Sequence, residues 1–118
     1  MKNKPYYKLL IWQRAHELTV AIYKETTSFP ASEKFGLTSQ LRRSAASVPT
    51  NIVEGYARGG QKEFWRFLSI ARASLTEAEY LLELSRDIGF LPLKNFERLE
   101  PLRARTSFLL MKFMTSIK

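Results

Sequence analysis

The sequence contains no cysteine and a single histidine, His16. A chain without cysteine forms neither disulfides nor thiolate metal sites, and this absence fits a reducing compartment. Di-iron sites in helical bundles require Glu-x-x-His pairs, and no glutamate lies three residues before His16. One histidine is also too few for an ordinary zinc site. The sequence therefore predicts no metal and no cofactor.

Motifs that carry catalysis are also missing. No complete GxGxxG or GxxxxGK[ST] loop is present, so no phosphate-binding loop is predicted. His16 would be the only histidine base for a catalytic triad, and no arrangement of nucleophile and acid around it is evident. We expect that the protein is not an enzyme.

Long hydrophobic runs are absent as well. The longest are about four residues, as at 108–111, whereas a helix that spans a bilayer needs about 20 apolar residues. The N-terminal segment is basic but has no long apolar run before Gln13 and Arg14, which does not fit a signal peptide. These features predict a soluble cytoplasmic protein without membrane association.

What the chain does contain is enough apolar material for one domain. It has 118 residues, of which 45% are hydrophobic and 13% aromatic, so we expect a single domain over residues 1–118 with its own core. Its net charge is +8. A positive field of this size favours anionic partners, nucleic acid first.

Apolar residues recur every three or four positions in four segments, which we interpret as helices over residues 11–28, 37–57, 61–88 and 93–116. Short links between them predict an all-α, antiparallel up-down-up-down four-helix bundle. Pro49 and Pro101 fall inside helices, where we expect bends. Gly59 and Gly89 are expected to follow helix ends. The apolar stripes comprise Ile11, Ala15, Leu18, Ile22 and Thr26; Leu37, Leu41, Ala45, Val48, Ile52 and Tyr56; Phe64, Leu68, Ala71, Leu75, Ala78, Leu82 and Ser85; and Phe96, Leu99, Leu102, Thr106, Leu109, Phe113 and Ile117.

The third segment is apolar over more than one stripe. At 100° per residue, Ile70, Leu81 and Ile88 fall together beside its main stripe, and Trp65 lies on the opposite flank. A surface helix needs only one apolar stripe, so these four residues predict a second buried face, either an interface in a homo-oligomer or a contact with a protein partner. The alternative is that they are half-buried at the edges of a monomeric bundle.

Asn51 and Glu54 lie within one helical turn of Ile52 and Tyr56, in apolar surroundings. A buried carboxylate needs a partner, and the candidates are Arg43, Arg58 and Arg72. We interpret Asn51 and Glu54 as a structural polar network, since no second acidic group at matched spacing supports a catalytic role.

Six basic residues cluster within 31 positions and are the candidate nucleic-acid-binding residues. Arg58, Lys62 and Arg66 are spaced by four, and Phe64 and Trp65 lie among them, where exposed aromatic rings stack on unpaired bases. The alternative is a solvated face whose arginines pair with Glu54, Glu63 or a neighbouring subunit. The six residues are Arg42, Arg43, Arg58, Lys62, Arg66 and Arg72.

The same region carries a family resemblance. Its marks are Phe29-Pro30 with Glu33, the run from Leu37 to Arg43, Val48-Pro49 with Asn51-Ile52 and Glu54-Gly55, and the run from Phe67 to Arg72. With these marks the chain resembles the four-helix bundle proteins encoded in intervening sequences of bacterial 23S ribosomal RNA genes. The resemblance covers about residues 11–91. The fourth helix matches only in general character, and its Pro101 is a departure.

The resemblance implies a four-helix bundle that assembles as a homopentamer, and it supplies no catalytic residues. It extends to the accessory proteins of diversity-generating retroelements, which are basic bundles that work with a reverse transcriptase and RNA. The resulting prediction is a non-enzymatic, oligomeric accessory protein that binds nucleic acid, RNA above all, through its basic surface. The alternative is a pure protein-interaction or assembly module without specific affinity for nucleic acid.

Overall fold

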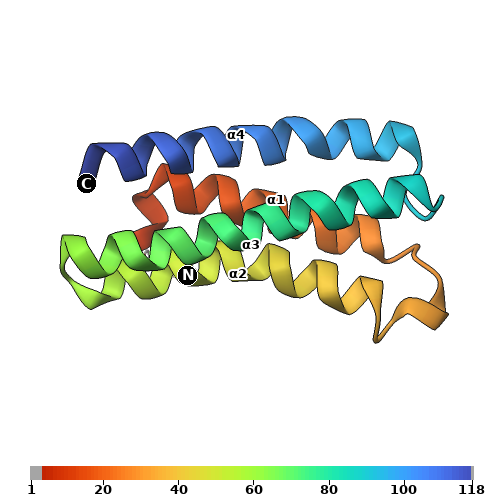
Figure 1. Ribbon diagram of the computed structural model, residues 1–118, viewed down its shortest axis with the longest axis horizontal. Coiled ribbons are helices and arrows are strands. Elements are labelled where there is room, and N and C mark those ends of the chain that lie inside the picture. Colours follow the sequence, from red (N-terminus) through yellow and green to blue (C-terminus); the bar gives the residue numbers. More distant parts are fainter. Residues whose placement is uncertain (1–3, 118) are drawn as a thin grey trace.

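The computed structural model describes residues 4–117 and consists of four long helices and two short 3-10 helices. Successive long helices run in alternating directions, which gives the up-down-up-down bundle visible in Figure 1. The predicted all-α fold is confirmed, and the predicted ends lie within two residues of those observed. The elements are η1 (Pro5–Lys8), α1 (Leu10–Thr26), η2 (Ala31–Glu33), α2 (Leu37–Arg58), α3 (Gln61–Asp87) and α4 (Leu93–Ile117).

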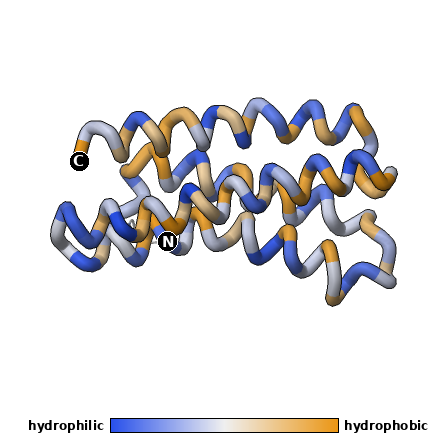
Figure 2. The backbone as a smooth tube through the Cα atoms, viewed as in Figure 1, coloured by the Kyte–Doolittle hydropathy of each residue, from blue (hydrophilic) through white to orange (hydrophobic). Residues whose placement is uncertain are grey.

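The four helices pack as a ring of neighbours: α2 lies between α1 and α3, and α4 also contacts α1 and α3. Hydrophobic and hydrophilic segments alternate along each helix in Figure 2, as expected when one side of each faces a shared core. The stripe predicted for α1 is buried in full. Those predicted for α2 and α3 are buried except for Tyr56 and Phe64, which are half-buried.

The predicted stripe of α4 is wrong beyond Thr106. The buried residues there are Leu110 and Met114, whereas Leu109 and Phe113 pack only partly against the core. Residues 109 and 110, like residues 113 and 114, are adjacent apolar pairs. Two stripes one residue apart are therefore nearly equivalent in the sequence, and packing against α1 and α3 selects between them.

The corner between α2 and α3 depends on two glycines with different functions. Gly59 has a φ of 83°, the left-handed conformation that ends α2. Gly55 lies one turn earlier, where α2 approaches α3 closely. A Cβ atom at Gly55 would lie 2.7 Å from Cβ of Phe67 and 2.9 Å from Cδ1 of Phe64, so the helices meet here without room for a methyl group.

Both proline-containing helices continue through their prolines, Pro49 and Pro101. Pro49 has no N–H, so the Ala45 carbonyl lacks its usual helical donor. The hydroxyl of Thr19 in α1 donates to that carbonyl at 3.0 Å. The interruption in the hydrogen bonds of α2 thus becomes a contact between two helices.

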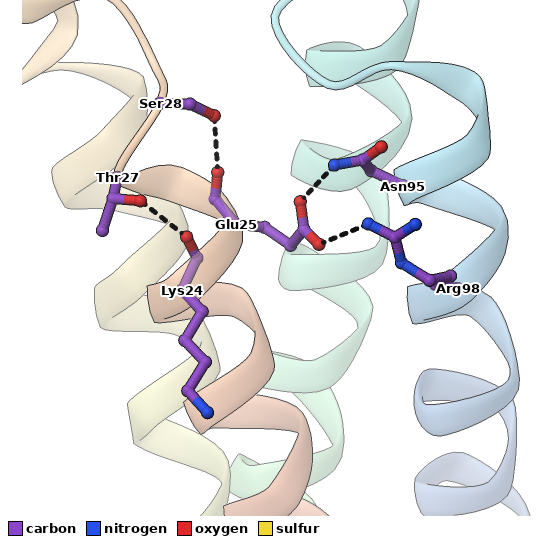
Figure 3. Close-up of polar contacts among 6 residues, drawn as sticks. All are labelled: Lys24, Glu25, Thr27, Ser28, Asn95 and Arg98. Atoms are coloured by element: carbon purple, nitrogen blue, oxygen red, sulfur yellow. Dashed lines mark hydrogen bonds and ion pairs between the residues drawn. The ribbon is translucent and has the colours of Figure 1, made fainter.

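The end of the bundle opposite the α2–α3 corner is joined by Glu25 of α1. Its carboxylate accepts a hydrogen bond from Asn95 Nδ2 at 2.7 Å and lies 3.4 Å from Arg98 Nη2, both in α4 (Figure 3). The hydroxyls of Thr27 and Ser28 donate to carbonyls of the last turn of α1. The contacts of Glu25 hold the start of α4 against the end of α1, and the bonds of Thr27 and Ser28 stabilise the end of α1 itself.

Candidate nucleic-acid interface

Positive charge is distributed unevenly along the bundle. The start of α1, the α2–α3 corner and the end of α4 lie at the same end (Figure 1). We call residues 4–18, 48–74 and 105–117, which make up that side of the bundle, the basic half. It carries nine lysines and arginines against three glutamates. Residues 19–47 and 75–104, which we call the neutral half, carry eight of each sign. The net positive charge of the described residues therefore lies entirely in the basic half.

The structure divides the six predicted binding residues between the two halves. Arg58, Lys62, Arg66 and Arg72 lie in the basic half, and Arg42 and Arg43 lie outside it. Arg43 and Arg58 are fifteen residues apart on α2, about 22 Å at a rise of 1.5 Å per residue. The six residues do not form one continuous surface.

Arg42 is engaged within the chain. Its Nε donates to the Thr26 hydroxyl at 2.7 Å, and its Nη2 donates to the Tyr23 carbonyl at 3.1 Å. Its guanidinium lies 4.8 Å from the centre of the Tyr23 ring. These contacts attach α2 to the end of α1, so Arg42 is a packing residue. Arg43 is exposed and lines a polar groove of about 520 Å³ with Ser39, Ser74 and Glu77, among others.

Arg58 and Arg66 converge on one ring. Their guanidinium carbons lie 5.0 Å and 4.6 Å from the centre of the Phe67 ring. The left-handed Gly59 interrupts the helix between them, so Arg58 does not continue the row of Lys62 and Arg66 that the spacing of four suggested.

Arg66 also forms two hydrogen bonds with Glu63, at 3.0 and 3.1 Å. These bonds hold the pKa of the Glu63 carboxyl below its ordinary value of 4.5, and the carboxylate in turn raises the pKa of Arg66. The pair is exposed, so its contribution to stability is small. Two glutamates, Glu54 and Glu63, were considered from the sequence as ion-pair partners of the arginines. Among the described residues, Glu63 forms such a pair and Glu54 does not.

Two exposed cations of the basic half lie on the outer surface of α3. Lys62 and Arg72 are exposed and form no hydrogen bond or ion pair through their side chains within residues 4–117. Trp65 lies between them and is 36% exposed. Ser69 lies on the same face, so this side of the first three turns of α3 has cationic, aromatic and hydroxyl groups and no acid.

Trp65 separates two hollows between α3 and α4. The first, of about 380 Å³, is lined by Lys62, Trp65 and Ile117 together with Gln61. The second, of about 110 Å³, includes Trp65, Arg72 and two methionines of α4 in its lining. The walls of the first hollow are mostly apolar, so Trp65, with a cation on either side of it along α3, borders an accessible apolar surface.

Five further cations of the basic half were not predicted as binding residues from the sequence. They lie far from the α2–α3 corner in the chain, and the alternating helices bring them to the same half of the bundle: Lys4, Lys8, Arg14, Arg105 and Lys112. The signal that reveals them is the net charge of each half, counted after the helix directions have been assigned.

The proposed oligomer residues divide as well. Ile70 and Ile88 are 40% and 49% exposed, and Trp65 is also exposed. Leu81 is only 5% exposed and belongs to the core, so its assignment to an outer interface is wrong for the single chain. The reason is that α3 packs against both α2 and α4, which buries a wider arc than one stripe.

The expected Asn51–Glu54 network is only half correct. Asn51 Nδ2 donates to the Ser47 carbonyl and hydroxyl at 2.8 and 2.9 Å, and the Ser47 hydroxyl lies 2.8 Å from that of Ser74. These bonds connect α2 to α3. Glu54 points outward, is exposed and has no ion pair among the described residues, because its position on α2 is turned away from the core.

Within residues 4–117, no group of three or more His, Cys, Asp or Glu side chains is placed to hold a metal ion. His16 stacks on Trp12, with ring centres 4.9 Å apart. None of the helices in the described part of the chain is long and apolar enough to cross a membrane.

Comparison with known proteins relates the chain to one family. A model of the family described as "23S rRNA-intervening sequence protein" matches residues 7–112. Among solved structures, the chain is similar to a protein of unknown function from the S23 ribosomal protein family of Bacteroides thetaiotaomicron, with a TM-score of 0.79 and 24% identity over 89% of this chain and 98% of that chain. At that identity the similarity shows the fold alone. No curated protein matches the chain.

Proposed function

Because the chain belongs to the 23S rRNA-intervening sequence protein family, and because its positive charge is concentrated in one half of the bundle, we propose that it is a non-enzymatic accessory protein that binds RNA. The basic half is the binding surface, and Lys62 and Arg72 are exposed cations on its α3 side. Arg58 and Arg66 add charge at the corner while they pack on Phe67.

The charge imbalance of the basic half is the observation that carries the proposal. Nine cations against three acids produce a local positive field, whereas the rest of the described chain is neutral. Each phosphate contact releases bound counterions, so binding weakens with salt by a slope of about −0.7 per contact on a single strand. Three or four contacts at the basic half give a slope of roughly −2 to −3.

The experiment measures binding of a labelled single-stranded RNA by fluorescence anisotropy over a salt series. Lys62→Ala and Arg72→Ala should each weaken binding and reduce the salt slope by about one. Lys94→Ala is the matched control, because Lys94 is an exposed lysine of α4 in the neutral half. Equal losses for Lys62→Ala and Lys94→Ala would contradict a localised surface, and undetectable or salt-independent binding would refute the function.

The protein is proposed to act as a homo-oligomer, a pentamer by its resemblance to the family, in the cytoplasm. The exposed Ile70 of α3 and the exposed Ile88, which directly follows α3, support subunit contacts, because large apolar side chains at the surface favour association. Several subunits would present several basic halves to one RNA, which raises overall affinity through multivalency. By its likeness to the retroelement accessory proteins, a reverse transcriptase is the proposed protein partner.

The same exposed isoleucines favour the second candidate function, a pure assembly module whose charge only maintains solubility. To distinguish the RNA-binding function from the assembly module, light scattering and RNA binding are measured on the same samples. Ile70→Glu should lower the mass of the oligomer in both cases, because a charge in an apolar interface is unpaired. A stable oligomer that binds RNA no better than an unrelated basic protein would favour the assembly module, and a monomer for the unmodified chain would refute self-association.

A further inference from the structure

Trp65 gives the basic half a feature that charge alone does not explain. Exposure of the apolar surface of an indole to water is unfavourable. Trp65 is nevertheless 36% exposed, between two hollows of the α3–α4 groove. The other aromatic residue suggested for stacking, Phe64, is already occupied: its ring contacts those of Tyr56 and Phe113, with centres 6.0 and 5.6 Å away. Trp65 is therefore the accessible aromatic of the pair.

The surroundings of Trp65 suit a polyanion that carries flat apolar groups, because they combine two cations with an apolar hollow. Lys62 is three residues before it and Arg72 seven residues after it, about 5 and 10 Å along the helix axis in opposite directions. The hollow beside Trp65 that Lys62 and Ile117 line has a volume of about 380 Å³. Sites for small ligands measure roughly 300–1,000 Å³, so this hollow has room for one planar group but not for a folded partner.

We propose that this groove binds an unpaired nucleotide of the RNA, with its base stacked on Trp65 and its flanking phosphates on Lys62 and Arg72. The inference rests on the proposed RNA-binding function and specifies its ligand. A paired base presents only its edges, so a duplex reaches the cations but not the indole face. Unpaired bases are the parts of RNA that stack on aromatic side chains.

The test compares two labelled RNAs of the same sequence, one unpaired and one annealed to its complement. The unmodified protein should bind the unpaired RNA more tightly. Trp65→Ala should lower that affinity about 5- to 150-fold, the effect of removing one stacked base, and leave duplex affinity nearly unchanged. Trp65→Phe should retain most of the affinity. Tyr80→Ala is the matched control, since Tyr80 is a 59% exposed aromatic of α3 in the neutral half.

A second measurement does not depend on the stability of Trp65→Ala. The chain has two tryptophans, Trp12 and Trp65, so Trp12→Phe leaves Trp65 as the single reporter of indole fluorescence. Unpaired RNA should quench its emission along the same titration curve as the anisotropy. Absence of quenching at saturating RNA would overturn the proposal.

The outcomes separate this inference from the function on which it rests. If Trp65→Ala weakens unpaired and duplex RNA equally, or neither, the protein binds RNA without base stacking and only the groove proposal fails. If Trp65→Ala lowers the oligomer mass in light scattering, Trp65 belongs to a subunit contact and the proposal is likewise overturned. If the unmodified protein binds neither RNA, the proposed function fails together with it.

Discussion

Substitution of Thr19 by valine tests how this bundle accommodates a proline inside α2. Pro49 cannot donate to the Ala45 carbonyl, and Ala45 is only 1% exposed, so water does not replace the missing donor. The Thr19 hydroxyl lies 3.0 Å from this carbonyl and 2.8 Å from that of Ala15. The Ala15 carbonyl also receives the helical N–H of residue 19, so only Ala45 depends on the hydroxyl.

Valine keeps the shape of threonine and removes the hydroxyl. A buried acceptor left without a donor costs about 1–3 kcal/mol, and the half-buried position of Thr19 favours the lower part of this range, about 1–2 kcal/mol. With a urea m-value of about 1–3 kcal/mol/M, the unfolding midpoint should fall by roughly 0.3–2 M. Thr76→Val is the control, because the Thr76 hydroxyl is exposed and bonds only to Arg72 of its own helix.

A double-mutant cycle with Pro49→Ala isolates the contact. Alanine at position 49 restores the N–H that donates to the Ala45 carbonyl, so Thr19→Val should cost less than about 0.5 kcal/mol in that background. The two unfolding curves must be measured at one protein concentration, since self-association adds to apparent stability. Equal costs of Thr19→Val with Pro49 and with alanine at position 49 would refute the claim that the hydroxyl replaces the missing donor.

The helices were predictable because the buried residues of each helix recur every three or four positions along the sequence. In α1 the buried set, from Ile11 to Thr26, is the set that spacing by three and four selects. The links were also visible, since Phe29-Pro30 and Gly59 disfavour helical continuation for local reasons. In both cases the relevant interaction lies within a few residues of the chain.

The wrong predictions of burial arise where the packing of neighbouring helices decides which side chains are buried. Leu81 was assigned to an outer interface because one stripe already seemed sufficient for α3, yet α3 packs against both α2 and α4, and Leu81 is buried in the core. Leu110 was missed because Leu109 offers an equivalent period one residue earlier. Neither choice can be made from one helix alone, since it depends on the angle at which the neighbouring helices approach.

The candidate binding surface was predicted only in part, because its composition also depends on how the helices are arranged in space. Proximity in the chain grouped Arg42 with Arg58, but sixteen residues of α2 separate them by about 24 Å, and they lie in different halves. Lys8 and Lys112 are distant in the chain and share a half. Charge clusters on long helices are therefore better judged by position along the bundle than by sequence separation.

The remaining predictions concern the α2–α3 corner. Gly55→Ala places a methyl group 2.7 Å from Cβ of Phe67 and should destabilise the protein by about 1–3 kcal/mol in urea unfolding, whereas Gly60→Ala, with no atom within 4 Å of the new group, should cost less; the reverse order would contradict a close helix contact at Gly55. The second prediction concerns pH. Arg66 holds the pKa of Glu63 below 4.5, so the folded state binds this proton less readily than the unfolded chain does. The stabilisation is therefore complete above the unfolded pKa of about 4.5 and is lost as the pH falls through the lower folded value. Glu63→Gln removes the titrating carboxyl, so the melting temperature of the variant should fall less steeply than that of the unmodified protein as the pH is lowered from about 5 to 3. Because the pair is exposed, added salt should shrink the difference. Parallel pH profiles at low salt would show that the bond with Arg66 does not shift the titration of Glu63.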